Sequence, residues 1–128
     1  MKGVLPVLGL LLLAVGLGAC SGANRGPSGV TASADPNAVH ISARDLKFST
    51  AELSAPAGKS FSIVFDNQES APHNVAIYKD SAATMKVFAE DPFGGPRTVA
   101  YQVSALAAGT YFFRCDLHTE MKGTLTVK

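Results

Sequence analysis

Residues 110–128, TYFFRCDLHTEMKGTLTVK, contain the strongest indications of how this chain folds. Two segments of alternating apolar and polar residues, 110–114 and 122–128, flank a loop that is too short for a helix. Because side chains alternate along a strand, Tyr111, Phe113 and Cys115 share one face of the first segment. The stretch therefore predicts two neighbouring β-strands, with the loop joining them at one end of a sheet.

That loop carries three donors for a soft metal ion. Cys115, His118 and Met121 are each separated by two residues and offer a thiolate, an imidazole and a thioether. Two histidines and a cysteine in a plane, with a weak axial methionine, form the ligand set of a mononuclear blue-copper site. The best candidate for the second histidine is His73, which begins a predicted strand after the turn-rich residues 67–72. The sequence thus predicts one copper ion bound by His73, Cys115, His118 and Met121.

Other interpretations of these residues were weighed. A single Cys or Met is usually core filling, and zinc would accept His73, Cys115, His118 and a carboxylate such as Glu120 but would leave Met121 unexplained. A catalytic multicopper site needs more histidines than the three in this chain, and a dinuclear copper centre needs two cysteines in its loop. The remaining histidine, His40, is interpreted as an ordinary strand residue.

The rest of the chain from Val39 onward also has a β pattern. Short alternating segments separated by turn residues predict strands at 39–43, 46–48, 52–54, 60–66, 73–78 and 97–103, in addition to the two described above. Residues 81–90 are compatible with one short helical turn, and residues 91–96 with a loop because they hold two Pro and two Gly. About seven or eight short strands with no long amphipathic helix predict an all-β, antiparallel β-sandwich.

The first 38 residues differ in composition from this domain. Lys2 and the apolar run 4–17 predict a signal peptide, and Leu17-Gly18-Ala19-Cys20 resembles the lipobox of bacterial lipoproteins. The expected organisation is a lipoprotein signal peptide at 1–19, a flexible tether at 20–38 and a domain at 39–128. Cys20 would carry the lipid, which would leave Cys115 as an unpaired thiol in an oxidising, extracytoplasmic compartment.

Charge argues against several classes of partner. Removal of the signal peptide leaves ten basic and ten acidic residues, dispersed along the chain. Such a balance gives no basic patch of the kind that binds nucleic acid. We expect a monomer that attaches to the membrane through Cys20 and meets its protein partners through a local patch.

The combined motif resembles the cupredoxins, the type 1 blue copper proteins. Pro72-His73-Asn74 followed by Cys115-x-x-His118-x-x-Met121 is similar to the family pattern over residues 39–128, and the compact loop is most similar to that of the amicyanins, with plastocyanins and pseudoazurins as relatives with longer loops. The resemblance implies a Greek-key sandwich in which His73, Cys115 and His118 are equatorial ligands, Met121 is axial and Asn74 ties the ligand loop to the His73 strand. Leu117 departs from the pattern, because many relatives have Pro there.

The function that the resemblance implies is one-electron transfer between extracytoplasmic redox partners, without enzymatic activity. We expect His118 at the solvent edge, surrounded by an apolar docking patch of Ala71, Pro72, Phe93 and Leu117. The alternative is a copper-binding protein that delivers the ion to an oxidase. Such delivery sites favour open, Met-rich coordination, whereas an intact Cys, two His and Met favour redox work.

Overall fold

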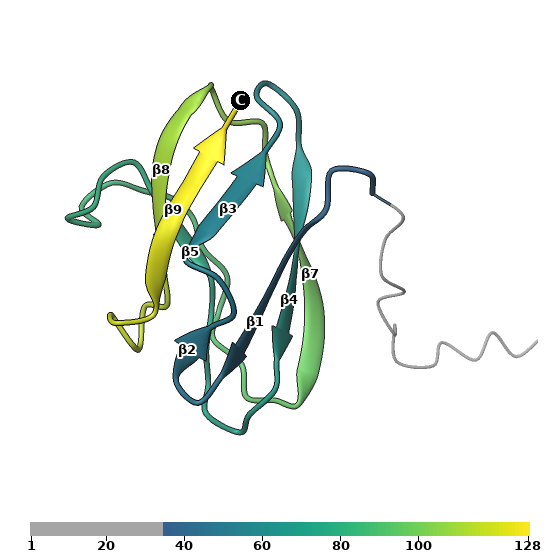
Figure 1. The fold of residues 1–128 in the computed structure, drawn as a ribbon, viewed down its shortest axis with the longest axis vertical. Coiled ribbons are helices and arrows are strands. Elements are labelled where there is room, and N and C mark those ends of the chain that lie inside the picture. Colours follow the sequence, from purple (N-terminus) through teal and green to yellow (C-terminus); the bar gives the residue numbers. More distant parts are fainter. Residues whose placement is uncertain (1–34) are drawn as a thin grey trace, which may run out of the picture.

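The computed structural model describes residues 35–128, and this part of the chain is built from β-strands with no helix. The predicted signal peptide, the lipidation site Cys20 and most of the predicted tether lie outside the described residues. Nine strands follow one another along the described part (Figure 1): β1 Val39–Arg44, β2 Lys47–Phe48, β3 Glu52–Ala55, β4 Phe61–Asn67, β5 Ala76–Tyr78, β6 Lys86–Phe88, β7 Arg97–Val103, β8 Gly109–Arg114 and β9 Lys122–Val127. Within residues 35–128 there is accordingly no helix that could span a membrane.

The strands form two sheets that face each other, which confirms the predicted all-β sandwich. One sheet has the order β2-β1-β4-β7 and the other β3-β9-β8-β5-β6. The pairing is more mixed than the predicted antiparallel arrangement, because β1 lies parallel to β4 and β3 parallel to β9. Alternation along a strand specifies which residues face the core but not the direction of the neighbouring strand, so the sequence pattern could not distinguish the two cases.

The main local difference from prediction lies between the fifth and seventh strands. Residues 81–90 were compatible with a helical turn, but they contain turns followed by β6, which pairs with β5 at the sheet edge. The predicted strand 73–78 is shorter in the structure, where only Ala76–Tyr78 form β5 and His73 makes an isolated bridge to Phe93. Strands of only three residues, such as β5 and the edge strand β6, give little sequence signal, which explains both differences.

The core lies between the sheets and consists of apolar side chains from both. Its largest fully buried members include Phe61, Ile63, Phe65, Ile77, Phe113 and Leu125. Aromatic rings continue this core toward one end of the sandwich, where Phe65 packs against Phe93 at a centroid distance of 5.4 Å. That packing gives the loops at this end a rigid base.

The sandwich has two distinct ends. The ligand-loop pole, at the bottom of Figure 1, comprises the β1–β2 turn at residues 45–46 and the loops 68–75, 89–96 and 115–121. The opposite pole comprises the connections 56–60 and 104–108. Both predicted histidine ligands and Cys115 therefore belong to the same pole.

Candidate metal centre

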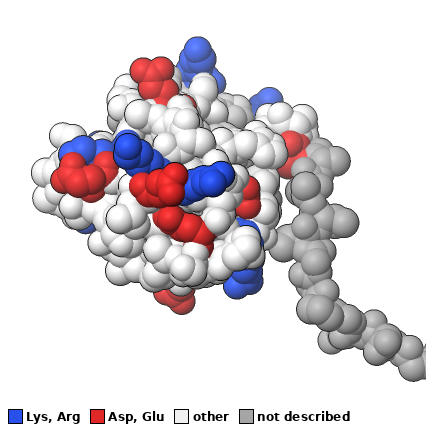
Figure 2. Space-filling model, turned by 60° about the horizontal axis from the view of Figure 1, so that its bottom comes forward, with Lys and Arg blue, Asp and Glu red and all other residues white. Residues whose placement is uncertain are grey.

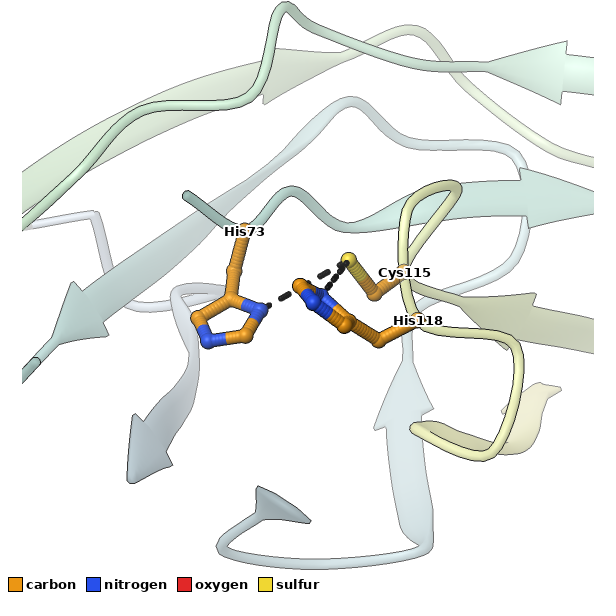
Figure 3. A group of neighbouring side chains, drawn as sticks. All are labelled: His73, Cys115 and His118. Atoms are coloured by element: carbon orange, nitrogen blue, oxygen red, sulfur yellow. Dashed lines mark hydrogen bonds between the residues drawn. The ribbon is translucent and has the colours of Figure 1, made fainter. Parts of the chain in front are cut away.

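Three predicted ligands converge at the ligand-loop pole. The Sγ of Cys115 lies 3.8 Å from the Nδ1 of His73 and 3.8 Å from the Nδ1 of His118. One donor atom from each of the three residues falls within 4.8 Å of the others. Figure 3 shows both imidazoles directed toward the sulfur, His73 from the loop before β5 and the other two residues from the loop after β8.

The three residues differ in their access to solvent. His73 and Cys115 are fully buried, whereas His118 is half-buried. Met121 is also buried, at 2% exposure, and its backbone closes the loop: its N–H donates to the carbonyl of His118 and its carbonyl accepts from the N–H of Cys115. His118 thus forms the solvent edge of the group, as the sequence predicted.

The spacing of these atoms fits a single metal ion. Metal–nitrogen and metal–sulfur bonds of about 2.0 and 2.3 Å, arranged in a trigonal plane, separate the nitrogen and sulfur by about 3.7 Å. Both observed separations are 3.8 Å. Glu120, the carboxylate considered for zinc, is 92% exposed and does not belong to the group, and His40 lies exposed on β1. The donor set is therefore the soft one, with Cys, two His and a buried Met nearby.

Glu69 fixes the orientation of the buried histidine. Its Oε1 lies 2.6 Å from the Nε2 of His73. A carboxylate at that distance accepts a hydrogen bond from an Nε2 proton, so in the neutral ring the lone pair lies on Nδ1, the nitrogen that faces Cys115. No sequence pattern pointed to Glu69, because its separation from His73 has no regular meaning within a loop.

The same carboxylate also holds the β1–β2 turn. It accepts hydrogen bonds from the backbone N–H groups of Asp45 and Leu46, both of which have positive φ. The N–H of Leu46 and then the His73 ring are the main causes that keep the pKa of Glu69 below its ordinary value. Glu69 therefore joins a strained turn of one sheet to the predicted ligand His73.

Two buried asparagines order the surrounding loops. The Nδ2 of Asn67 donates to the carbonyls of Ala71 and Phe93, at 2.8 and 2.7 Å. Asn74 accepts from the N–H of Asp116 at 2.8 Å and donates to the carbonyl of Glu90 at 2.9 Å. Asn74 thus connects the His73 segment to the ligand loop, which is the contact that the resemblance to the cupredoxins implied for it.

Asp116 is a second residue to which no sequence pattern pointed. Its carboxylate accepts from the Tyr78 hydroxyl, from the Lys86 Nζ at 2.9 Å and from the Asn74 Nδ2 at 3.3 Å. Burial pushes the pKa of Asp116 upward, but these hydrogen bonds outweigh it, so the pKa lies below its ordinary value. The partners come from β5, β6 and the loop before β5, a combination that only the folded chain reveals.

The surface around His118 combines apolar and charged residues. Of the four residues of the predicted docking patch, Leu117 is 53% exposed, Pro72 is exposed, and Ala71 and Phe93 are half-buried. Figure 2 brings this pole toward the viewer and shows acidic and basic side chains interspersed over the described surface. The described residues at this pole therefore form no large surface area of a single charge sign.

A β-sandwich with a thiolate and two imidazoles at one pole has the architecture of a small copper protein. A family model for the Cupredoxin-like domain matches residues 9–127. The chain belongs to the cupredoxin family. Copper is accordingly its cofactor, and blue-copper electron transfer is the activity of the family to which it belongs.

Individual relatives agree with this assignment. The amicyanin of Paracoccus versutus is 30% identical over 95 residues, which make up 72% of this chain and 66%, just under two thirds, of that protein. The dithionite-reduced auracyanin of Roseiflexus castenholzii superposes with a TM-score of 0.64 at 24% identity, covering 73% of this chain and 98% of its own. Auracyanin A of Chloroflexus aurantiacus, a "blue" copper protein, superposes with a TM-score of 0.61 at 24% identity, covering 71% of this chain and 98% of its own. These two structures establish the similarity of fold.

Proposed function

We propose that the chain is a one-electron carrier of an extracytoplasmic compartment in which His73, Cys115 and His118 are the equatorial copper ligands and Met121 is the axial one. The convergence of one donor atom from each of the first three within 4.8 Å carries this proposal. Copper, when bound, supplies a Cu(II)/Cu(I) couple. The protein residues hold the donors and exclude water from all but one edge.

The way in which each donor is held suits repeated electron transfer. Glu69 fixes the His73 ring, and Asn74 fixes the backbone directly after Cys115. The loop hydrogen bonds of Met121 fix the other end of the ligand loop. Ligands that move little between oxidation states keep the barrier to transfer low, so we propose that this bonding maintains one geometry for both states.

Half-exposed His118 is the proposed point of electron entry and exit. Leu117, Pro72, Ala71 and Phe93 form the proposed docking patch around it, and the interspersed charges of this pole favour a small, transient interface. The electron donor and acceptor are proteins that recognise a small apolar surface.

A reversible redox titration of the copper-loaded full chain tests this function, followed by a challenge of the reduced protein with a Cu(I) chelator. A carrier takes up one electron per copper reversibly and keeps its metal in both states. Rapid loss of Cu(I) to the chelator would contradict electron transfer and favour delivery of copper to another protein.

We also propose that Cys20 anchors the protein in a membrane, with residues 1–19 removed as a signal peptide, 20–38 as the tether and 39–128 as the cupredoxin domain. The lipobox-like sequence Leu17-Gly18-Ala19-Cys20 supports this proposal. Detergent partitioning of the full-length product and of Cys20→Ala tests it, since lipid would provide the membrane affinity of the processed chain. Partition of both forms into the aqueous phase would contradict the anchor.

A further inference from the structure

Asp116 lies at the centre of a charged cluster beside the predicted thiolate ligand. The Asp116 cluster consists of Tyr78, Lys86, Arg114 and Asp116. Arg114 and Asp116 are the chain neighbours of Cys115 on either side. Lys86 lies with its Nζ 2.9 Å from the Asp116 carboxylate, and the Arg114 Nε is 3.7 Å from it. One anion thus faces two cations next to a buried sulfur.

The cluster is partly shielded from water. The side chain of Asp116 is 23% exposed and that of Arg114 is 27% exposed. Tyr78, which donates its hydroxyl to Asp116, is buried, and both cations contact its ring, with Lys86 Nζ at 5.5 Å and Arg114 Cζ at 5.0 Å from the centroid. Charges in such a position interact more strongly with a neighbouring site than charges in open solvent do.

We propose that Asp116 is the residue that holds the redox potential of this site down, and that Lys86 is the opposing cation that limits its effect. The inference rests on the proposed copper function. Reduction adds one negative charge to the site, so a nearby anion disfavours the reduced state and a nearby cation favours it. Asp116 acts through charge and position, without itself binding the metal.

The geometry allows charge to be separated from structure. The N–H that Asp116 donates to Asn74 belongs to the backbone, so it survives a change of side chain. Asp116→Asn keeps the side-chain size and one oxygen acceptor for Tyr78 while removing the charge. Lys86→Met removes the opposing charge from a side chain that is 48% exposed.

The test measures the redox potentials of Asp116→Asn, Lys86→Met and the double variant in the copper-loaded full chain at low ionic strength. Asp116→Asn should raise the equilibrium constant for reduction, by roughly tenfold. Lys86→Met should lower that constant by a smaller factor, and the double variant should fall between the two single variants. Lys59→Met is the matched control, because Lys59 is an exposed cation at the opposite pole and its removal should leave the potential unchanged.

Opposite shifts from the two single variants support the proposal. Shifts in the same direction, or shifts no larger than that of Lys59→Met, overturn it. If Asp116→Asn fails to fold, as judged by thermal unfolding without copper, the direction of the Lys86→Met shift decides alone: a fall supports the proposal and a rise overturns it. A wild-type protein that binds Cu(II) without an intense visible band would overturn the proposed function as well, whereas a coloured wild type with unmoved variants overturns only the role of Asp116.

Discussion

The two poles of the sandwich differ in how far their loops depend on side-chain hydrogen bonds. At the opposite pole, backbone groups pair with each other: the N–H of Ala57 donates to Lys128, that of Gly58 to Leu106 and that of Lys128 to Ala55. At the ligand-loop pole, buried side chains add to such backbone pairs by bonding the backbone of irregular loops. Three of the four buried polar residues of the described chain lie at or next to this pole: Asn67 at the end of β4, His73 and Asn74. Backbone pairing tolerates many sequences, whereas side-chain pairing requires particular residues. The metal pole is therefore the part of the fold that its sequence specifies most tightly.

The largest expected difference between the poles comes from Asn67. Asn67→Ala removes the side-chain donor of the Ala71 carbonyl, one of the two donors of the Phe93 carbonyl, which keeps the His73 N–H, and the acceptor of the Glu69 N–H. We expect the free energy of unfolding to fall by about 3 kcal/mol. Ser60→Ala, at the exposed turn of the opposite pole, should change it by less than about 0.5 kcal/mol. Urea unfolding of the copper-free proteins measures both values, and equal effects would remove the contrast between the poles.

Glycines at the two poles provide a second contrast. A Cβ at Gly95 would meet the carbonyl oxygen of Asn67 and, at 2.8 Å, that of Glu69, so Gly95→Ala must displace backbone. At Gly58 a Cβ would meet nothing within 4 Å, although φ is +68°. We expect a loss of about 2 to 3 kcal/mol for Gly95→Ala and about 1 kcal/mol for Gly58→Ala. Thermal unfolding compares the two, and a larger loss at Gly58 would show that the close contact at Gly95 relaxes easily.

The hydrogen bonds that Glu69 makes at the ligand-loop pole should also increase copper affinity. Glu69→Ala frees the His73 ring and the β1–β2 turn, so copper affinity should fall by about 10- to 100-fold. Glu120→Ala removes a carboxylate of the same pole that is 92% exposed and should leave the affinity unchanged. Competition with a chelator of known affinity measures both. Equal affinities of Glu69→Ala and wild type would mean that packing alone orients His73.

The smallest expected effect is an acid dependence away from the ligand-loop pole, in the segment before β1. Asp35 accepts from the N–H of Asn37 and from Ser62, and these bonds hold its pKa below the ordinary value of 3.8. A carboxyl with a lowered folded-state pKa contributes stability above its unfolded pKa and loses it as the pH falls through the folded pKa. The urea midpoint of the wild type should therefore be higher than that of Asp35→Asn near neutral pH. The two midpoints should converge as the pH falls below 3.8. A difference that persists undiminished in strong acid would contradict this assignment.

Strands and candidate ligands could be predicted from the sequence, whereas the residues that hold the ligands in place could not. Alternation at 60–66 and 110–114 predicted strands that correspond to β4 and β8, and the spacing of Cys115, His118 and Met121 predicted the ligand loop from chemistry alone. Glu69 and Asp116 were not identified, since their partners come from distant segments that only the fold brings together. Local patterns thus predicted the candidate ligands, whereas the residues that hold those ligands depend on tertiary contacts.

The absorption spectrum of the full chain loaded with Cu(II), recorded beside that of Cys115→Ser, tests the central claim most directly. Cys115 is fully buried, with its Sγ 3.8 Å from two imidazole nitrogens, so its thiolate should bond copper and give an intense visible charge-transfer band. We expect a strongly coloured wild type and loss of that band in Cys115→Ser, even if the variant still binds copper. A colourless wild type, or a Cys115→Ser protein that keeps the band, would contradict it.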